Sequence, residues 1–133
     1  MTDYATAAEV LDAIDRREAD VAGRLAAIAR AVGGVQAFAD SVGADQARHR
    51  AERDTLRRRL RLAASAPPSP PAKADLSLSA LREAQQQLVH AHAEGLPALG
   101  DAGAVDLLAR HMVDEARHLT VIDLWLEAEE ARG

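Results

Sequence analysis

Apolar residues recur at three- and four-residue intervals through four long stretches of the chain, which is the pattern of amphipathic helices. These stretches cover residues 2–32, 35–63, 76–99 and 102–131. Glycine and proline fall between them, at Gly33 and Gly34, from Pro67 to Pro71, and from Gly95 to Gly103. Because both residue types interrupt helices, we predict four helices and an all-α fold.

The lengths of the three connections predict how the helices are arranged. The break at Gly33-Gly34 and the turn near Gly100 are short, so each joins an antiparallel pair of helices. The proline-rich connection, residues 64–75, could span the length of a helix at about 3.3 Å per residue, whereas a simple up-down bundle needs only a short loop. We therefore expect one domain over residues 1–133, a four-helix bundle of two antiparallel hairpins, 1–63 and 76–133, joined by a long crossover. The alternative is that this proline-rich stretch is a flexible linker and not a crossover. The candidate N-caps of the later helices are Asp75, Ser77 and Asp101.

The composition narrows the kinds of partner and chemistry. The chain carries 16 basic and 21 acidic residues, and this negative balance disfavours nucleic acid and anionic membranes as partners. It has no cysteine, so a metal site would have to use histidine and carboxylate ligands. No apolar run approaches the length of about 20 residues that a membrane helix needs, and the first residues lack a basic-then-apolar signal, so we expect a cytoplasmic location. Apolar residues on several faces of the helices lead us to expect a homodimer.

Each predicted helix carries a polar residue where its apolar stripe passes the middle of the bundle. These residues are Glu18, His49, Gln85, and the pair Glu115 and His118. Glu18 and His49 each lie 15 residues from the first turn, and so are level in an antiparallel pair. Gln85 and Glu115 each lie 15 residues from Gly100, which predicts one polar layer. Because a buried carboxylate is strongly unfavourable unless it is paired or bound to a metal, this layer predicts a shared cation.

A short motif in the layer resembles a known family. Glu115 and His118 form a Glu-x-x-His pair, and residues 113–118 (VDEARH) are echoed by residues 44–49 (ADQARH). Together with an inward Glu18, this pattern resembles the ferritin-like di-iron carboxylate proteins, in which two helices each supply a Glu and two others each supply a Glu-x-x-His. Carried over to this chain, the resemblance implies four metal ligands: Glu18, His49, Glu115 and His118.

Two positions depart from the family pattern. Gln46 and Gln85 stand where the family has glutamates, and a neutral amide is a weaker ligand for a hard cation. Asp45 or Glu52, each within one helical turn of His49, could replace the missing carboxylates. The further candidate ligands are Gln46, Glu52 and Gln85. Two imidazoles and two carboxylates suit iron or manganese, and also zinc. For iron, the resemblance implies ferroxidase-like or other oxidative chemistry, while the residues leave open whether the protein is an enzyme.

Two other interpretations of the polar layer stay open. The first is a metal-free helical bundle that acts as an interaction or accessory module, with Glu18 and Glu115 neutralised by arginine or by sharing a proton. The arginines within reach are Arg24, Arg48 and Arg53. The second is a haem or other cofactor carrier, for which the histidine pairs are His92 with His111 and His49 with His118. Between His92 and His111, which lie level, we expect a structural hydrogen bond.

Overall fold

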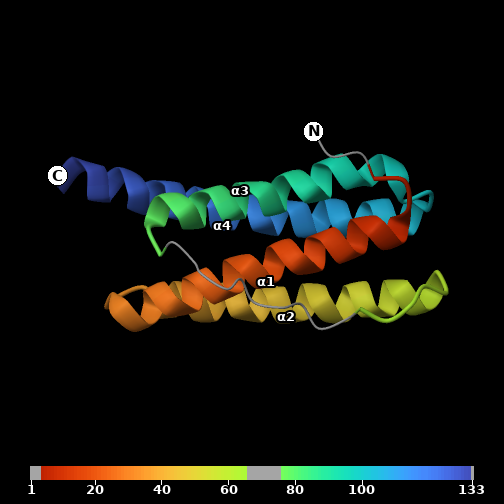
Figure 1. The fold of residues 1–133 in the computed structure, drawn as a ribbon, viewed down its shortest axis with the longest axis horizontal. Helices are drawn as coiled ribbons and strands as arrows, with labels where there is room; N and C mark the ends of the chain where they lie inside the picture. Colours follow the sequence, from red (N-terminus) through yellow and green to blue (C-terminus); the bar gives the residue numbers. More distant parts are fainter. Residues whose placement is uncertain (1–3, 66–75, 133) are drawn as a thin grey trace.

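The computed structural model describes residues 4–65 and 76–132, and this part of the chain forms four α-helices and no strand. The helices are α1 (Ala7–Ala31), α2 (Gln36–Arg59), α3 (Leu78–Gly95) and α4 (Ala102–Arg132), with a short 3-10 helix, η1 (Leu96–Ala98), after α3. Figure 1 shows the long helices packed side by side along a common direction. The predicted all-α four-helix bundle is confirmed.

The direction of the helices agrees with two antiparallel hairpins. In Figure 1, α1 and α2 run in opposite directions, as do α3 and α4, while α2 ends at one end of the bundle and α3 begins at the other. Most of the expected crossover, residues 64–75, lies outside the described residues. α1 packs closely against α3, and α3 against α4, whereas α2 and α4 approach each other less closely. The turns before α2 and α4 use positive φ at Gly34 (90°) and Gly100 (64°), a conformation that glycine adopts without strain.

Three helix ends differ from the sequence prediction, each for a local reason. α1 begins after Thr6 and not at residue 2, because the Thr6 hydroxyl accepts a hydrogen bond from the backbone N–H of Glu9 at 3.2 Å. α2 ends at Arg59 and not at residue 63, because Arg61 adopts a left-handed φ of 58° and the N–H of Leu62 bonds back to the Arg57 carbonyl at 2.8 Å. α3 ends at Gly95 and not at residue 99, where the chain tightens into η1 around Pro97.

The predicted caps of the later helices are confirmed where the structure describes them. Ser77 Oγ accepts a hydrogen bond from the N–H of Ala80 at 3.1 Å, and Asp101 Oδ2 accepts one from the N–H of Ala104 at 2.8 Å. Asp75 lies outside the described residues. These caps satisfy backbone donors that a helix start leaves free, so α3 and α4 begin near the predicted positions.

The core combines an apolar shell with a polar centre. Apolar side chains from all four helices are buried, including Leu11, Leu56, Leu88 and Leu108, whereas Val32, the residue after α1, is 51% exposed. Polar and charged side chains are buried at mid-bundle and beside it. They are Asp15, Glu18, Gln46, His49, Arg53, Arg57, Gln85, His92, His111, Glu115 and His118. A polar layer therefore crosses the middle of the core, as the sequence predicted.

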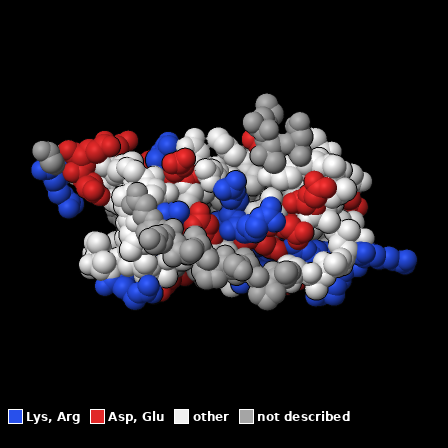
Figure 2. Space-filling model, in the orientation of Figure 1, with Lys and Arg blue, Asp and Glu red and all other residues white. Residues whose placement is uncertain are grey.

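The outer surface is mixed in charge. On the face drawn in Figure 2, the basic side chains at the centre are bordered by acidic ones and do not form a broad basic area. None of the helices in the described part of the chain is long and apolar enough to span a bilayer. The buried histidines and carboxylates that could bind a metal lie inside the bundle.

Candidate metal centre

The residues predicted to share one layer come together in space. Gln85 Nε2 donates hydrogen bonds to the backbone carbonyl of Glu115 at 2.9 Å and to its Oε2 at 2.8 Å, so α3 and α4 have the predicted register. Glu18, His49 and Glu115 each offer one ligand atom, and these three atoms lie within 4.8 Å of one another. The level placement of Glu18 with His49, and of Gln85 with Glu115, is confirmed.

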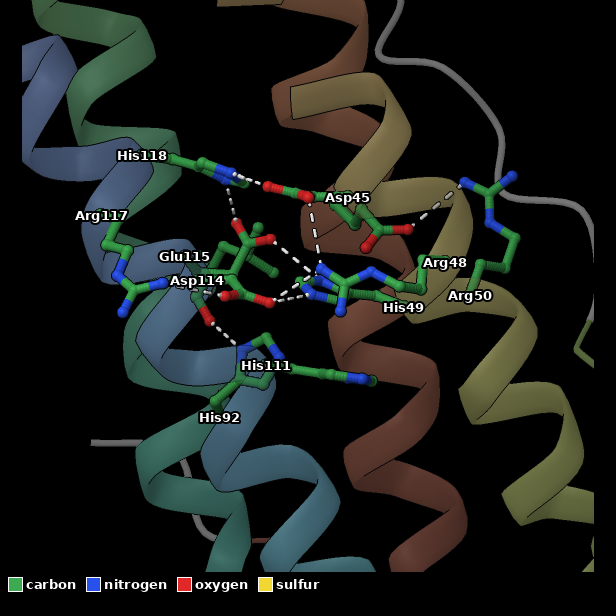
Figure 3. Close-up of polar contacts among 12 residues, drawn as sticks. Asp45, Arg48, His49, Arg50, His92, His111, Asp114, Glu115, Arg117 and His118 are labelled. Carbon is green, nitrogen blue, oxygen red and sulfur yellow. Dashed lines mark hydrogen bonds and ion pairs between the residues drawn. The ribbon is translucent and has the colours of Figure 1, made fainter. Parts of the chain in front are cut away.

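Glu115 lies between two imidazole rings. Its Oε1 is 3.3 Å from His49 Nδ1, and its Oε2 is 3.4 Å from His118 Nδ1 (Figure 3). Three of these atoms form no hydrogen bond with the described residues: His49 Nδ1, His118 Nδ1 and Glu115 Oε1. Two ring nitrogens and one carboxylate oxygen are therefore buried with close neighbours but without hydrogen bonds.

The far side of each ring is held by an aspartate from the opposite helix. His49 Nε2, on α2, lies 2.8 Å from Asp114 Oδ2 on α4, and His118 Nε2, on α4, lies 2.8 Å from Asp45 Oδ2 on α2. A carboxylate is only an acceptor, so each Nε2 carries the proton that it donates. In the neutral ring, Nδ1 then presents its lone pair to Glu115.

This reciprocal arrangement of two aspartates and two histidines was not predicted. We considered Asp45 as a replacement metal ligand, but its Oδ2 accepts from the outer nitrogen of His118. The signal was present in the repeated segments 44–49 and 113–118, because in each the aspartate stands four residues before the histidine. The repeat indicated that the two helices are related, but not that each aspartate bonds the histidine of the other.

Electrostatics keep Glu115 ionised. Burial alone would raise the pKa of Glu115, but the neighbouring His118, His49 and Gln85 lower it well below its usual range. Burial would likewise lower the pKa of His49 and of His118, but Glu115 and the partnering aspartates outweigh burial and raise both. The centre of the layer is therefore a carboxylate that attracts positive charge.

Glu18 has a different partner. Arg53 donates to both of its oxygens, from Nη1 to Oε2 at 3.1 Å and from Nη2 to Oε1 at 2.8 Å, and donates from Nε to Asp15 Oδ1 at 2.9 Å. Arg57 Nη2 adds a contact of 2.7 Å to Asp15 Oδ2. Arg53 is one of the three arginines considered from the sequence, and the charges of Glu18 and Asp15 are thus matched by Arg53 and Arg57.

The remaining candidates lie around this centre. Gln46 is buried, while the Glu52 side chain is 37% exposed and its Oε1 lies 3.2 Å from His111 Nε2. The expected hydrogen bond between His92 and His111 is wrong, because His92 Nε2 and His111 Nδ1 have no hydrogen-bond partner among the described residues. His92 Nδ1 instead donates to the Leu88 carbonyl at 2.8 Å, and His111 stacks on His49 with ring centroids 4.0 Å apart. Burial lowers the pKa of His92 and of His111 to about 4, so both rings are neutral at pH 7.

Comparisons with known proteins do not assign the chain to a family. Models of known protein families gave no match. Neither curated proteins nor solved structures gave a significant match.

Proposed function

We propose that this protein binds a divalent transition metal at mid-bundle, with iron or manganese as the preferred ion and zinc as a further candidate. Glu115 is the central ligand, His49 and His118 flank it, and Glu18 lies beside it. One observation carries the proposal: the buried Nδ1 atoms of both histidines face the Glu115 carboxylate at 3.3 and 3.4 Å without a hydrogen bond.

A cation between these atoms removes an unfavourable contact. When His49 carries a proton on Nε2 alone, its Nδ1 lone pair points at an ionised carboxylate oxygen, and two electron-rich atoms at this distance repel each other unless a metal ion or a second proton lies between them. Metal ligands at about 2.1 Å from one ion, separated by the angles of octahedral or tetrahedral coordination, lie about 3.0 to 3.4 Å apart. The distances from Glu115 to His49 and to His118 therefore suit ligands of a metal ion.

The charges of the layer support the same interpretation. Glu18 and Asp15 are matched by buried arginines, whereas Glu115 pairs with histidines alone among the described residues. A fully buried carboxylate without an arginine or lysine partner is a site where a cation binds favourably.

The donor set also bears on the chemistry. Imidazole and carboxylate ligands suit iron and manganese, and the aspartates behind His49 and His118 orient the rings and strengthen them as ligands. Bound iron would supply one-electron redox chemistry at a buried position. The resemblance to ferritin-like di-iron carboxylate proteins extends the proposal to ferroxidase-like or other oxidative chemistry.

The second candidate function is a metal-free interaction or accessory module. The observation that favours it is the bidentate hydrogen bonding of Glu18 by Arg53, because a carboxylate held in this way is already neutralised. In this alternative, protons on His49 and His118 balance Glu115.

Metal analysis of the purified chain tests the proposal. We expect iron or manganese to copurify with the wild type or to bind after anaerobic loading. Bound metal should also raise Tm, because a free metal concentration about 100-fold above Kd stabilises the fold by about 2.7 kcal/mol. Glu115→Gln, which keeps the shape and removes the charge, should lose the metal and the Tm shift. The matched control is Glu83→Gln, an exposed position on α3, which should retain both. A wild type without metal after loading would favour the metal-free module.

A further inference from the structure

The two oxygens of Glu115 have different surroundings. Oε1 faces His49 and has no hydrogen bond from the described residues, and His49 together with Glu18 and Glu115 forms the group whose ligand atoms lie within 4.8 Å of one another. Oε2 faces His118 and accepts a hydrogen bond of 2.8 Å from Gln85. The candidate centre is therefore asymmetric, although the sequence repeat suggests two equivalent halves.

The orientation of the Gln85 amide is well determined by its neighbours. Its Nε2 lies 2.9 Å from the backbone carbonyl of Glu115 and 2.8 Å from Oε2, and both of these atoms are acceptors. Only the NH₂ end of the amide can occupy this position, and both of its hydrogens are used. Gln85 therefore presents partial positive charge to Oε2, and its fully buried side chain has little room to turn away.

The supply of negative charge is also unequal. On the His49 side, Glu18 and Glu115 place two carboxylates near one imidazole, and the hydrogen bonds from Arg53 leave each Glu18 oxygen a lone pair that could still bind an ion. On the His118 side, α3 contributes the neutral Gln85 to Oε2, and Asp45 is bonded to the outer nitrogen of the ring. A divalent ion on the His118 side would have one carboxylate oxygen, and that oxygen is already an acceptor for an amide.

We infer that the centre holds a single divalent cation, bound between His49 Nδ1 and Glu115 Oε1 with Glu18 beside it, and that Gln85 keeps a second ion away from Oε2. This inference rests on the proposed function and specifies which half of the layer performs it. Gln85 is thus a specificity-determining residue, because its amide sets the number of ions. Of the two histidines that flank Glu115 in the proposed function, only His49 binds the ion in this inference, whereas His118 faces Oε2 through a proton on Nδ1 and orients Glu115.

Counting manganese(II) ions tests the inference. We expect native mass spectrometry of the full chain to find one ion in the wild type and two in Gln85→Glu, in which the new carboxylate faces Oε2 and His118. Electron paramagnetic resonance should show an isolated manganese(II) ion in the wild type and a coupled pair in Gln85→Glu. The matched control is Gln87→Glu on the same helix, where the side chain contacts Arg17 at 2.7 Å, and it should bind one ion.

The two histidines give an independent comparison. His49→Ala should weaken manganese(II) binding at least 100-fold, whereas His118→Ala should change it less than 10-fold. Loss of binding in His118→Ala, or retention in His49→Ala, would overturn the inference, as would two ions in the wild type or one in Gln85→Glu. In each of these cases the proposed function would stand, whereas a wild type that binds no ion would refute both. If either alanine variant does not fold, the ion counts of Gln85→Glu and Gln87→Glu decide.

Discussion

Arg53 stabilises the polar layer through a complete set of hydrogen bonds. Its side chain is fully buried, and its guanidinium contacts Asp15 once and Glu18 twice, at 2.8 to 3.1 Å. Burial would lower the pKa of Arg53, but Glu18 and Asp15 raise it, so the charge is retained. A buried ion pair of this kind stabilises the fold only while both partners are present, since removing one leaves an uncompensated charge.

Arg53→Met is therefore expected to lower the free energy of unfolding by about 3 to 5 kcal/mol, because it leaves Glu18 and Asp15 buried without a full partner. Arg50→Met is the matched control, since Arg50 also approaches Glu18, at 3.5 Å, but its side chain is 50% exposed. Its effect should stay below about 1 kcal/mol. Urea denaturation of the two variants measures the difference, and equal losses would show that burial of Arg53 is not the cause.

The C-terminal end of α3 lies close against α1. Gly95 lies against the Val10 side chain, and a Cβ at this position would collide with Val10 Cγ1. Both residues are buried, so the collision could be relieved only by shifting the helices or the valine rotamer. Gly43, inside α2, has open space around its Cα. Glycine is thus required by packing at one position and not at the other.

The pair Gly95→Ala and Gly43→Ala should change stability in opposite directions. Gly95→Ala is expected to destabilise by about 1 to 3 kcal/mol through overpacking, and Gly43→Ala to stabilise by about 0.5 to 1 kcal/mol because alanine favours the helix. Thermal unfolding followed by circular dichroism measures both. Adding Val10→Ala to Gly95→Ala should recover part of the loss; no recovery would argue that the contact with Val10 is not responsible.

For the molecule as a whole, the homodimer stays a prediction from the sequence. A hollow of about 490 Å³ lies at one end of the bundle, where the turn after α1 meets the start of α3 and the end of α4. Val32 and Leu76 line it and are 51% and 48% exposed, and Trp125 completes its apolar wall. An exposed apolar region of this kind is typical of an interface.

Sedimentation equilibrium is expected to give twice the 14.1 kDa mass of one chain. Val32→Lys should shift the mass toward that of one chain, because a charged side chain would be desolvated in the interface. Val113→Lys, at an apolar residue on α4 that is 48% exposed away from this hollow, should leave the mass unchanged. A wild type with the mass of one chain would show that the dimer prediction is wrong.

Much of the layer could be predicted because it depends on short-range regularities. The helical period placed Glu18, His49, Gln85 and Glu115 on inward faces, and counting from the turns made them level. The end of α2 was missed because Arg61, and not glycine, adopts the left-handed conformation that terminates the helix. Composition carries no signal for such an ending, since arginine rarely adopts this conformation.

The sequence alone establishes the number of helices, their approximate ends and the depth of each polar residue, because period and turn position are local properties of the chain. The partners of those residues follow from the packing of helices in space. The rotation of each helix and the reach of its side chains decide that Arg53 pairs with Glu18 and that the aspartate of each helix bonds the histidine of the other. They also leave Glu115 without an arginine partner among the described residues. These contacts join residues more than 30 positions apart, so no local pattern specifies them.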